Sequence, residues 1–342
     1  SRNPIHGRAF GGNLQATGEQ KCPNCDRVYL EGLLYCPFDG ATLTQAAQGS
    51  VEAAATGVGY PIGKLVAGQY TILGQPIVGH AAHIYKVRHR QSNKVAALKV
   101  LQPELVGDGQ AVARFQSEAY LISTINHPHV VTIHDFGTTE EGYPFMALKF
   151  IEGPTLAQVL KTQKSLDVQR AVIIFSQVCA GLAQVHQQMK IHANLAPHHI
   201  LLTPTEVGAE LVTLIDFSRA QSLGVPQSDP PPLDYFGDAS KGVRYASPEQ
   251  LKAEVMDDRS DIYSLGCLLY EVLVGIPPFD GTNGVEIRNK HISKSPTPPS
   301  RAVPGRNVPP SLEQTILKAI EKTPDKRYQT VEKFARDLRE AM

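Results

Sequence analysis

The sequence predicts an α+β protein with a bilobal architecture, in which a strand-rich lobe precedes a helix-rich lobe. Two observations support this class. Short β-rich runs lie at 70–73, 84–87 and 95–100, and apolar residues recur at helical spacing after Leu156. Strands followed by helices along the chain are typical of α+β folds.

The strand-rich lobe also contains one predicted helix. Residues 111–125 carry apolar side chains at helical spacing, among them Phe115 and Ile122. Two further strands are predicted at 130–136 and 145–151.

The helix-rich lobe is predicted to contain four longer helices, at 168–188, 260–274, 312–321 and 331–342. The most apolar run, 262–276, includes Glu271 and two glycines. It therefore indicates a buried helix, and no apolar run approaches the ~18 residues of a membrane span.

Composition limits the classes of function. The chain has 342 residues, of which 42% are hydrophobic, and its 33 Lys and Arg residues balance 33 Asp and Glu residues. Zero net charge argues against bulk electrostatic binding to nucleic acid or to an anionic membrane. The polar, glycine-containing start has no apolar core typical of a signal peptide, so we expect a cytoplasmic protein.

Changes in composition predict four segments. Residues 1–20 form a polar, flexible lead, residues 21–44 a cysteine-containing module, and residues 45–65 a linker of small and polar residues. The dense apolar pattern of residues 66–342 predicts the main folded domain.

The cysteine-containing module resembles a zinc ribbon. Cys22 and Cys25 form one Cys-x-x-Cys knuckle, and Cys36 and Asp39 occupy the matching positions of a second. Zinc accepts thiolate and carboxylate ligands, so these four residues are the predicted zinc site. His6 is a further candidate for the fourth ligand, and the alternative is a small turn with free thiols and no metal.

The main domain contains a series of short motifs in a fixed order: Ala97-Leu98-Lys99, Glu118, the segment 192–202, Asp216-Phe217-Ser218, Ser247-Pro248-Glu249 and the helix start 261–266. In this order they resemble the motifs of the bacterial serine/threonine protein kinase family, in which the segment 192–202 corresponds to the catalytic loop. The resemblance spans about residues 66–342 and implies the bilobal kinase fold.

The resemblance also implies a nucleotide site in which Lys99 pairs with ATP phosphates, Glu118 supports that lysine and Asp216 binds metal. The implied nucleotide-binding positions are Lys99, Glu118, Asp216, Gly79, Ala97, Leu148 and Leu201. The alternative is a retained Lys99–Glu118 ion pair with Asp216 capping a turn and no ligand bound.

The catalytic loop departs from the family pattern at three positions. Asn194 stands where the family has a catalytic Asp, Ala196 replaces a Lys, and His199 replaces a metal-binding Asn. An amide cannot accept a proton as a carboxylate does, and Mg²⁺ prefers oxygen ligands to imidazole. Only Gly79 remains of the three glycines of the phosphate loop. Use of ATP and Mg²⁺ is therefore doubtful on the sequence.

Other matching positions are expected to be structural. The resemblance assigns Ile122, Ile133, His192 and Phe217 to a packed spine. It assigns Glu249, Asp261 and Arg327 to the scaffold.

The sequence thus favours a catalytically inactive kinase-like domain that regulates or scaffolds through protein–protein contacts, with other proteins as its partners. Three alternatives remain at this point: a nucleotide-binding switch, a weakly active atypical Ser/Thr kinase, and a structural subunit of a larger assembly. We expect no nucleic-acid partner and no membrane span, and the oligomeric state is open.

Overall fold

The computed structural model divides the chain into two compact units. It describes residues 19–21, 23, 28–30, 44–45, 59–206, 208–223, 243–303, 305 and 307–342. The first unit takes in the chain up to residue 94 together with 98–116 and 135–146. The second takes in 95–97, 117–134 and 147–342.

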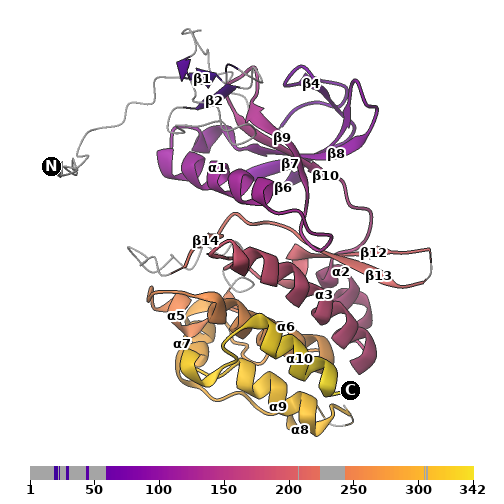
Figure 1. Cartoon of the computed structure of the whole chain (residues 1–342), viewed down its shortest axis with the longest axis vertical. Helices are drawn as coiled ribbons and strands as arrows, with labels where there is room; N and C mark the ends of the chain where they lie inside the picture. Colours follow the sequence, from indigo (N-terminus) through magenta and orange to yellow (C-terminus); the bar gives the residue numbers. More distant parts are fainter. Residues whose placement is uncertain are drawn as a thin grey trace, which may run out of the picture. The chain divides into compact units, whose positions relative to one another are not determined.

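A seven-stranded sheet organises the strand-rich part of the chain (Figure 1). Its strands are β4 (Leu65–Val66), β5 (Tyr70–Ile72), β6 (Ile77–Val78), β7 (Ala82–His89), β8 (Val95–Leu101), β9 (Ile133–Thr138) and β10 (Pro144–Lys149). The order is β4-β5-β7-β8-β10-β9, and β6 pairs with β7. β5 runs antiparallel to β7 with Tyr70 opposite His89. Tyr70 and Ile72 are buried, as the period of two in a strand requires.

Two helical segments follow β8: the 3-10 helix η1 (Pro103–Leu105) and α1 (Gly109–Thr124). The Asp108 carboxylate accepts a hydrogen bond from the Gln110 backbone N–H at 2.8 Å, which satisfies a donor at the start of α1.

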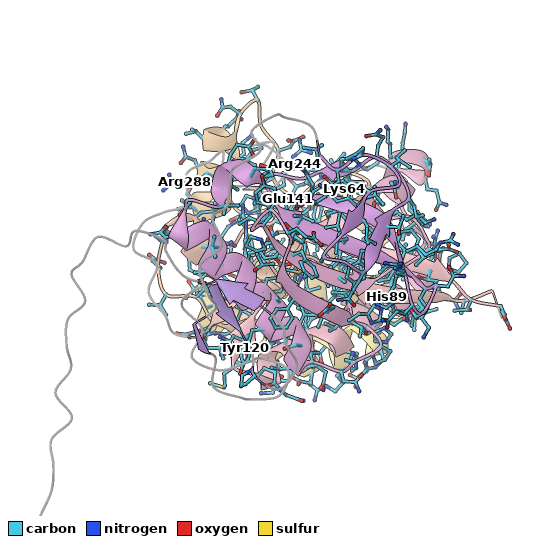
Figure 2. The ribbon with its side chains drawn as sticks, turned by 90° about the horizontal axis from the view of Figure 1, so that it is seen from above. Lys64, His89, Tyr120, Glu141, Arg244 and Arg288 are labelled. Atoms are coloured by element: carbon cyan, nitrogen blue, oxygen red, sulfur yellow. The ribbon has the colours of Figure 1, made fainter. Side chains whose placement is uncertain are left out.

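Tyr60 and Lys64, which precede the first strand of this sheet in the sequence, contact the turn between β9 and β10. Lys64 forms an ion pair with Glu141, and the labels of these two residues lie close together in Figure 2. The Tyr60 hydroxyl donates to the same carboxylate at 2.9 Å. The Tyr60 backbone N–H donates to the Tyr85 hydroxyl at 2.9 Å. These contacts hold residues that the sequence assigned to the linker.

The helical unit contains two short hairpins around the predicted catalytic-loop segment. β11 (Lys190–Ile191) pairs with β14 (Gln221–Ser222), and β12 (Ile200–Pro204) pairs with β13 (Glu210–Leu214). The 3-10 helix η2 (Pro197–His199) lies between β11 and β12.

The helices of this unit are α2 (Leu156–Gln163), α3 (Val168–Gln187), α5 (Pro248–Leu251), α6 (Asp258–Val274), α7 (Gly284–Ser293), α8 (Pro299–Ala302), α9 (Pro310–Ala319), η4 (Pro324–Lys326) and α10 (Val331–Glu340). Side chains cap several of their N-termini: Thr155, Asp167, Asp257 and Thr330 each accept a backbone N–H of the first turn of α2, α3, α6 and α10.

Helices α3, α6, α9 and α10 enclose the main core of this unit (Figure 1). In the described part of the chain, α3 alone is long and apolar enough to cross a membrane by length and composition. Its buried residues, among them Phe175 and Leu182, pack in this core, so α3 has the features of a soluble core helix.

The α+β prediction is confirmed, since a strand-rich part precedes a helix-rich part and all four long helices form within a few residues of the predicted bounds. The sequence analysis missed the β11–β14 and β12–β13 hairpins, because strands of two to five residues carry little periodic signal.

The N-terminal part contains a three-stranded antiparallel sheet in the order β2-β1-β3, with β1 (Glu19–Lys21), β2 (Val28–Leu30) and β3 (Thr44–Gln45). The predicted zinc ligands Cys22, Cys25, Cys36 and Asp39 lie outside the described residues.

Candidate functional site

Three of the singled-out residues meet at one carboxylate, that of Asp216. Asp216 follows β13 and has a φ of 61°, a left-handed conformation that Asp tolerates better than most residues. Its Oδ2 accepts a hydrogen bond from Asn194 Nδ2 at 2.9 Å and lies 3.0 Å from His199 Nε2. The Asp216 side chain keeps 26% of its surface exposed, so a ligand can reach it.

His199 also contacts the loop of Asn194 through its other ring nitrogen. Nδ1 lies 2.6 Å from the Asn194 backbone oxygen, and a carbonyl oxygen only accepts, so Nδ1 carries a hydrogen. The imidazole therefore ties the backbone of Asn194 to the side chain of Asp216.

Asp261, fully buried in α6, fixes the start of the same loop. Its carboxylate accepts the backbone N–H groups of His192 at 2.8 Å and Ala193 at 2.9 Å, and it contacts His186 Nε2 at 2.9 Å. Burial raises the pKa of Asp261, but the His186 contact and these N–H donors outweigh it and leave the pKa below its ordinary value. Ala193 adopts a φ of 55°, and the Asp261 hydrogen bond holds this left-handed backbone.

The predicted spine residues lie in or against one core. Ile122, His192 and Phe217 are each at most 1% exposed, and Ile133 packs against the same cluster. The rings of His192 and Phe217 are 4.5 Å apart. Burial lowers the pKa of His192 to about 4, so this ring is neutral at pH 7.

Glu118 is buried, and its Oε1 accepts a hydrogen bond from the Phe217 backbone N–H at 3.2 Å. Glu118 thus holds the residue next to Asp216. Of the other implied nucleotide positions, Leu148 packs against the helical core, and Leu201 is bridged to Thr155.

Lys99 is buried in β8 of the strand-rich unit, and Ala97 is a half-buried residue of the same strand. Gly79 forms the tight turn between β6 and β7, where its N–H donates to Ala82 O at 2.9 Å. A Cβ at Gly79 would lie 2.8 Å from that oxygen, so the turn itself requires glycine. The nucleotide roles of these residues stay predictions.

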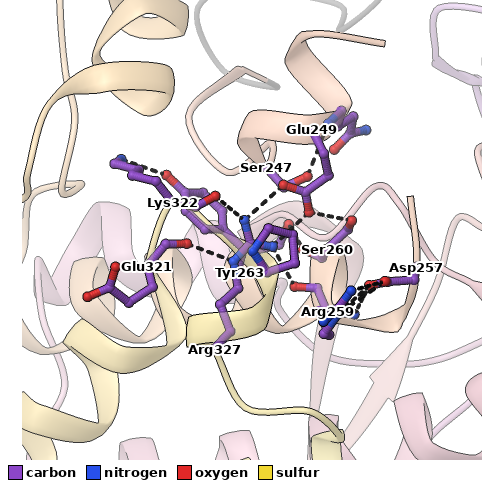
Figure 3. A network of polar contacts seen from close by, with 12 residues as sticks. Ser247, Glu249, Asp257, Arg259, Ser260, Tyr263, Glu321, Lys322 and Arg327 are labelled. Atoms are coloured by element: carbon purple, nitrogen blue, oxygen red, sulfur yellow. Dashed lines mark hydrogen bonds and ion pairs between the residues drawn. The ribbon is translucent and has the colours of Figure 1, made fainter. Parts of the chain in front are cut away.

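The predicted scaffold residues Glu249 and Arg327 form a buried bidentate ion pair (Figure 3). Arg327 Nη1 and Nη2 donate to the two Glu249 oxygens at 2.7 and 2.8 Å, and the Ser260 hydroxyl donates to Oε1 at 2.6 Å. Burial raises the pKa of Glu249, but the Arg327 pair outweighs it and lowers the pKa overall. This pair joins α5 to the segment before α10.

Sequence reasoning missed two residues that position the loop. His186 binds Asp261 from α3, and Gln250 Nε2 donates to Ala193 O at 2.9 Å. Their partners lie 75 and 57 residues away, and no local pattern marks such pairs.

The site brings together three polar groups: the solvent-reachable carboxylate of Asp216, the oriented amide of Asn194 and the imidazole of His199. Because Asn194 Nδ2 donates to Asp216, the amide oxygen of Asn194 remains as an acceptor for a substrate donor. Such a set can bind a cation at Asp216 and orient a hydroxyl at Asn194. Ala196 is buried and adds no polar group.

A model of the protein kinase domain matches residues 70–337. The chain is 34% identical over 277 residues to serine/threonine-protein kinase pkn3 of Myxococcus xanthus, covering 81% of this chain and 50% of that protein. It is 34% identical over 264 residues to serine/threonine-protein kinase PknB of Mycolicibacterium smegmatis, covering 76% of this chain and 41% of that protein. The chain thus spans half or less of the length of these curated relatives.

These relatives correct one expectation from the sequence. We expected a catalytically inactive regulatory or scaffolding domain, and that expectation is wrong: the relatives are named serine/threonine-protein kinases, and nothing in the comparisons indicates inactivity. Phosphoryl transfer depends largely on positioning and electrostatic stabilisation, so substitutions at three loop positions do not by themselves establish inactivity.

The family match and the retained motifs extend over both the strand-rich and the helical parts. The order of the motifs along the chain and the geometry around Asp216 agree with it. The chain belongs to the protein kinase domain family.

Proposed function

We propose that this chain is an ATP-dependent protein kinase that transfers the γ-phosphoryl group to a Ser or Thr hydroxyl of a protein. The observation that carries the proposal is the Asp216 carboxylate, which is reachable from solvent and oriented by Asn194 and His199. The names of the relatives, which are serine/threonine-protein kinases, support the class of acceptor.

The residues present fit a divalent metal ion that accompanies the nucleotide. In the described part of the chain, no group of three His, Cys, Asp or Glu side chains could hold a metal alone. Metal ions at phosphate sites are usually held by one or two carboxylates plus the phosphates, and Asp216 supplies such a carboxylate. When bound, the ion would neutralise charge on the transferring phosphoryl group.

The protein groups have separate tasks. Asp216 binds the metal, and Lys99 is proposed to bind phosphate, as its motif implies. Asn194 accepts the hydrogen bond of the attacking hydroxyl through its amide oxygen and so orients the nucleophile. The amide cannot take up the hydroxyl proton, which passes to an oxygen of the transferred phosphoryl group or to water as ADP leaves, so Asn194 contributes orientation alone.

The test is transfer of labelled γ-phosphate from ATP to dephosphorylated casein and to the chain itself. We expect transfer by the wild type and a loss of at least about a hundredfold in Asp216→Asn, because the cation loses its charged ligand. The matched control is Asp325→Asn, which removes an exposed carboxylate paired with Arg259. Equal transfer by wild type and Asp216→Asn, or no transfer by the wild type, would contradict the proposal.

We also propose that residues 21–44 form a zinc-binding module. Lys21 pairs with Val28, and Cys22 and Cys25 fall between these two residues in the sequence. Lys21 also pairs with Thr44, so the chain enters β3 at the same end of the sheet, shortly after Cys36 and Asp39. The sequence positions of the four candidate ligands, next to paired strands of one small sheet, support the proposal of a zinc-binding module.

Metal analysis of the purified chain tests the module. We expect about one zinc per chain, lost in Cys25→Ser and retained in Cys179→Ala, which changes a buried core thiol. Asp39→Ala reports whether the carboxylate is the fourth ligand. Zinc-free wild type, or zinc retained in Cys25→Ser, would contradict the proposal.

Protein substrates are the partners that this function requires, and we propose no nucleic-acid partner because positive and negative residues balance at 33 each.

A further inference from the structure

One stretch of the strand-rich unit carries positive charge alone. Between Glu52 and Glu104 the sequence contains no Asp or Glu. The same stretch contains six Lys and Arg residues: Lys64, Lys86, Arg88, Arg90, Lys94 and Lys99. The whole chain balances 33 basic against 33 acidic residues, so this excess of positive charge is local. It falls on the part of the sequence that forms β4 to β8.

Three of these residues, the hairpin cations Arg88, Arg90 and Lys94, lie exposed where β7 turns into β8. Arg90 extends β7 by one residue, because its N–H donates to Gln69 O at 2.7 Å. Residues two apart in a strand lie on one face about 6.6 Å apart, so Arg88 and Arg90 share a face of the sheet. The His89 N–H donates to Lys94 O at 2.9 Å, which brings Lys94 back beside the end of β7.

Contacts within the hairpin hold its turn in one conformation. The Asn93 N–H donates to His89 O at 2.9 Å, and the Ser92 N–H donates to His89 Nδ1 at 3.1 Å. Arg88 Nη1 donates to Asn93 Oδ1 at 3.3 Å. The turn is therefore ordered before any partner binds, which lowers the entropy cost of binding.

Carboxylates of the same unit do not neutralise the hairpin cations. In the part of the chain that the structure describes, none of the three forms an ion pair. The acidic residues of the β9–β10 turn are held by other groups: Glu141 pairs with Lys64, and Glu140 accepts the Ala67 N–H at 2.9 Å. The positive potential of the hairpin is thus left to attract an anionic partner.

We propose that the hairpin cations form a docking surface for an extended acidic segment of a partner protein. Alternate side chains of an extended peptide lie on one face about 6.6 Å apart, which is the spacing of Arg88 and Arg90. A short acidic segment covers the hairpin alone. A nucleic acid or a membrane would also face the rest of a chain in which acidic and basic residues balance. The surface uses none of the residues assigned to phosphoryl transfer, so it goes beyond the proposed function.

Fluorescence anisotropy of a labelled peptide of alternating Glu and Gln, added to the full chain without ATP, tests the inference. The peptide has no Ser or Thr, so binding is measured apart from phosphorylation. We expect it to bind, and a peptide with Ala in place of Glu to bind at least tenfold more weakly, because its attraction to the cations is lost. The affinity should fall severalfold as salt rises from about 0.01 M to about 0.15 M, which shortens the Debye length from about 30 Å to about 8 Å.

The hairpin variant combines Arg88→Gln, Arg90→Gln and Lys94→Gln. It should bind the acidic peptide about tenfold or more weakly, because each exposed ion pair contributes a few-fold to affinity. Circular dichroism and urea unfolding check that the variant folds. The salt dependence of the wild type is a second measurement that needs no variant.

The matched control combines Lys161→Gln, Lys326→Gln and Lys333→Gln. It removes the same charge from exposed positions of the helical unit, so it should bind the acidic peptide as the wild type does. An equal loss of affinity in this control would show that net charge alone governs binding and would overturn the inference.

Three other outcomes would overturn it. One is equal affinity of the wild type and the hairpin variant, and another is equal affinity for the acidic and the neutral peptide. The third is tighter binding of poly-thymidylate, or of vesicles containing phosphatidylserine, with loss of that binding in the hairpin variant, because the surface would then recognise a nucleic acid or a membrane. Phosphoryl transfer to casein is measured separately, so failure of this inference leaves the proposed function intact.

Discussion

At the scale of single residues, Asn194 sets the chemistry of the site most directly. Its Nδ2 donates to Asp216 at 2.9 Å, which orients the amide oxygen as an acceptor. An amide can orient a hydroxyl but cannot take up its proton. The rate of transfer should therefore respond to a carboxylate at this position.

We expect Asn194→Asp to raise the rate of phosphoryl transfer by about 10²- to 10⁴-fold, the usual contribution of a general base. The new carboxylate would face Asp216, so the rates should be compared at saturating divalent metal, which offsets the repulsion. Initial rates with labelled ATP measure the effect, and Asn194→Ala should fall below the wild type. An unchanged rate in Asn194→Asp would show that proton transfer does not limit the reaction.

The Glu249–Arg327 pair allows a second prediction at this scale. Both side chains are buried, at 5% and 0% exposure. Arg327→Met leaves the Glu249 charge without its partner and should lower the free energy of unfolding by about 3–5 kcal/mol. Arg336→Met removes an exposed pair with Asp337 and should change it by about 0–1 kcal/mol. Urea unfolding compares the two, and similar losses would contradict the assigned role.

At the scale of elements, α6 is central to the helical unit, because helices α3, α9 and α10 all pack against it. Gly266 lets α6 approach the end of α9. A Cβ there would lie 2.6 Å from Ile320 Cγ2 and 2.8 Å from Ala319 Cβ. The same helix carries Asp261, so its placement also sets the position of the loop that holds Asn194.

Gly266→Ala should therefore destabilise the protein by about 1–3 kcal/mol through overpacking. Gly109→Ala is the matched control, because a Cβ at the start of α1 meets nothing within 4 Å. That control should be neutral or slightly stabilising, since alanine restricts the unfolded chain. Thermal or urea unfolding gives both values, and equal stability of the two variants would refute the tight α6–α9 contact.

At the scale of the whole molecule, buried neutral histidines couple stability to pH. Burial, with repulsion from Lys322, lowers the pKa of His291 to about 3, and burial lowers that of His192 to about 4. The unfolded chain takes up these protons near pH 6.5, before the folded chain does. Stability should be highest above pH 6.5 and fall as the pH drops towards 4. The pKa values of Glu249 and Asp261 are lowered in the folded chain, so protonation of these carboxylates causes a further loss of stability as the pH falls.

His291→Gln should flatten the fall of unfolding free energy between pH 6.5 and 4, because the substituted side chain does not titrate. His291 Nδ1 lies 2.9 Å from the Tyr263 hydroxyl, and Gln retains an acceptor for that contact. His80→Gln, at an exposed position, should keep the wild-type slope. Urea unfolding at a series of pH values measures the slopes, and parallel slopes for wild type and His291→Gln would contradict this account.

The sequence by itself determined the order of strands and helices, because periods of two and 3.6 residues are local properties of the chain. The resemblance of its motifs to those of the kinase family also grouped Asn194, His199 and Asp216 before any geometry was known. The short hairpins β11–β14 and β12–β13 escaped prediction, since their pairing depends on partners far along the chain.

Only the tertiary structure decided which contacts those residues make with one another and with residues distant in the sequence. It placed His199 Nε2 at 3.0 Å from Asp216 Oδ2 and Nδ1 at 2.6 Å from the Asn194 carbonyl oxygen, so the imidazole links these two residues. It also joined Asp261 to His186 and Gln250 to Ala193 across 75 and 57 residues. Such contacts follow from packing of the helices, and a side chain's identity and neighbours in sequence do not specify which distant group it will meet.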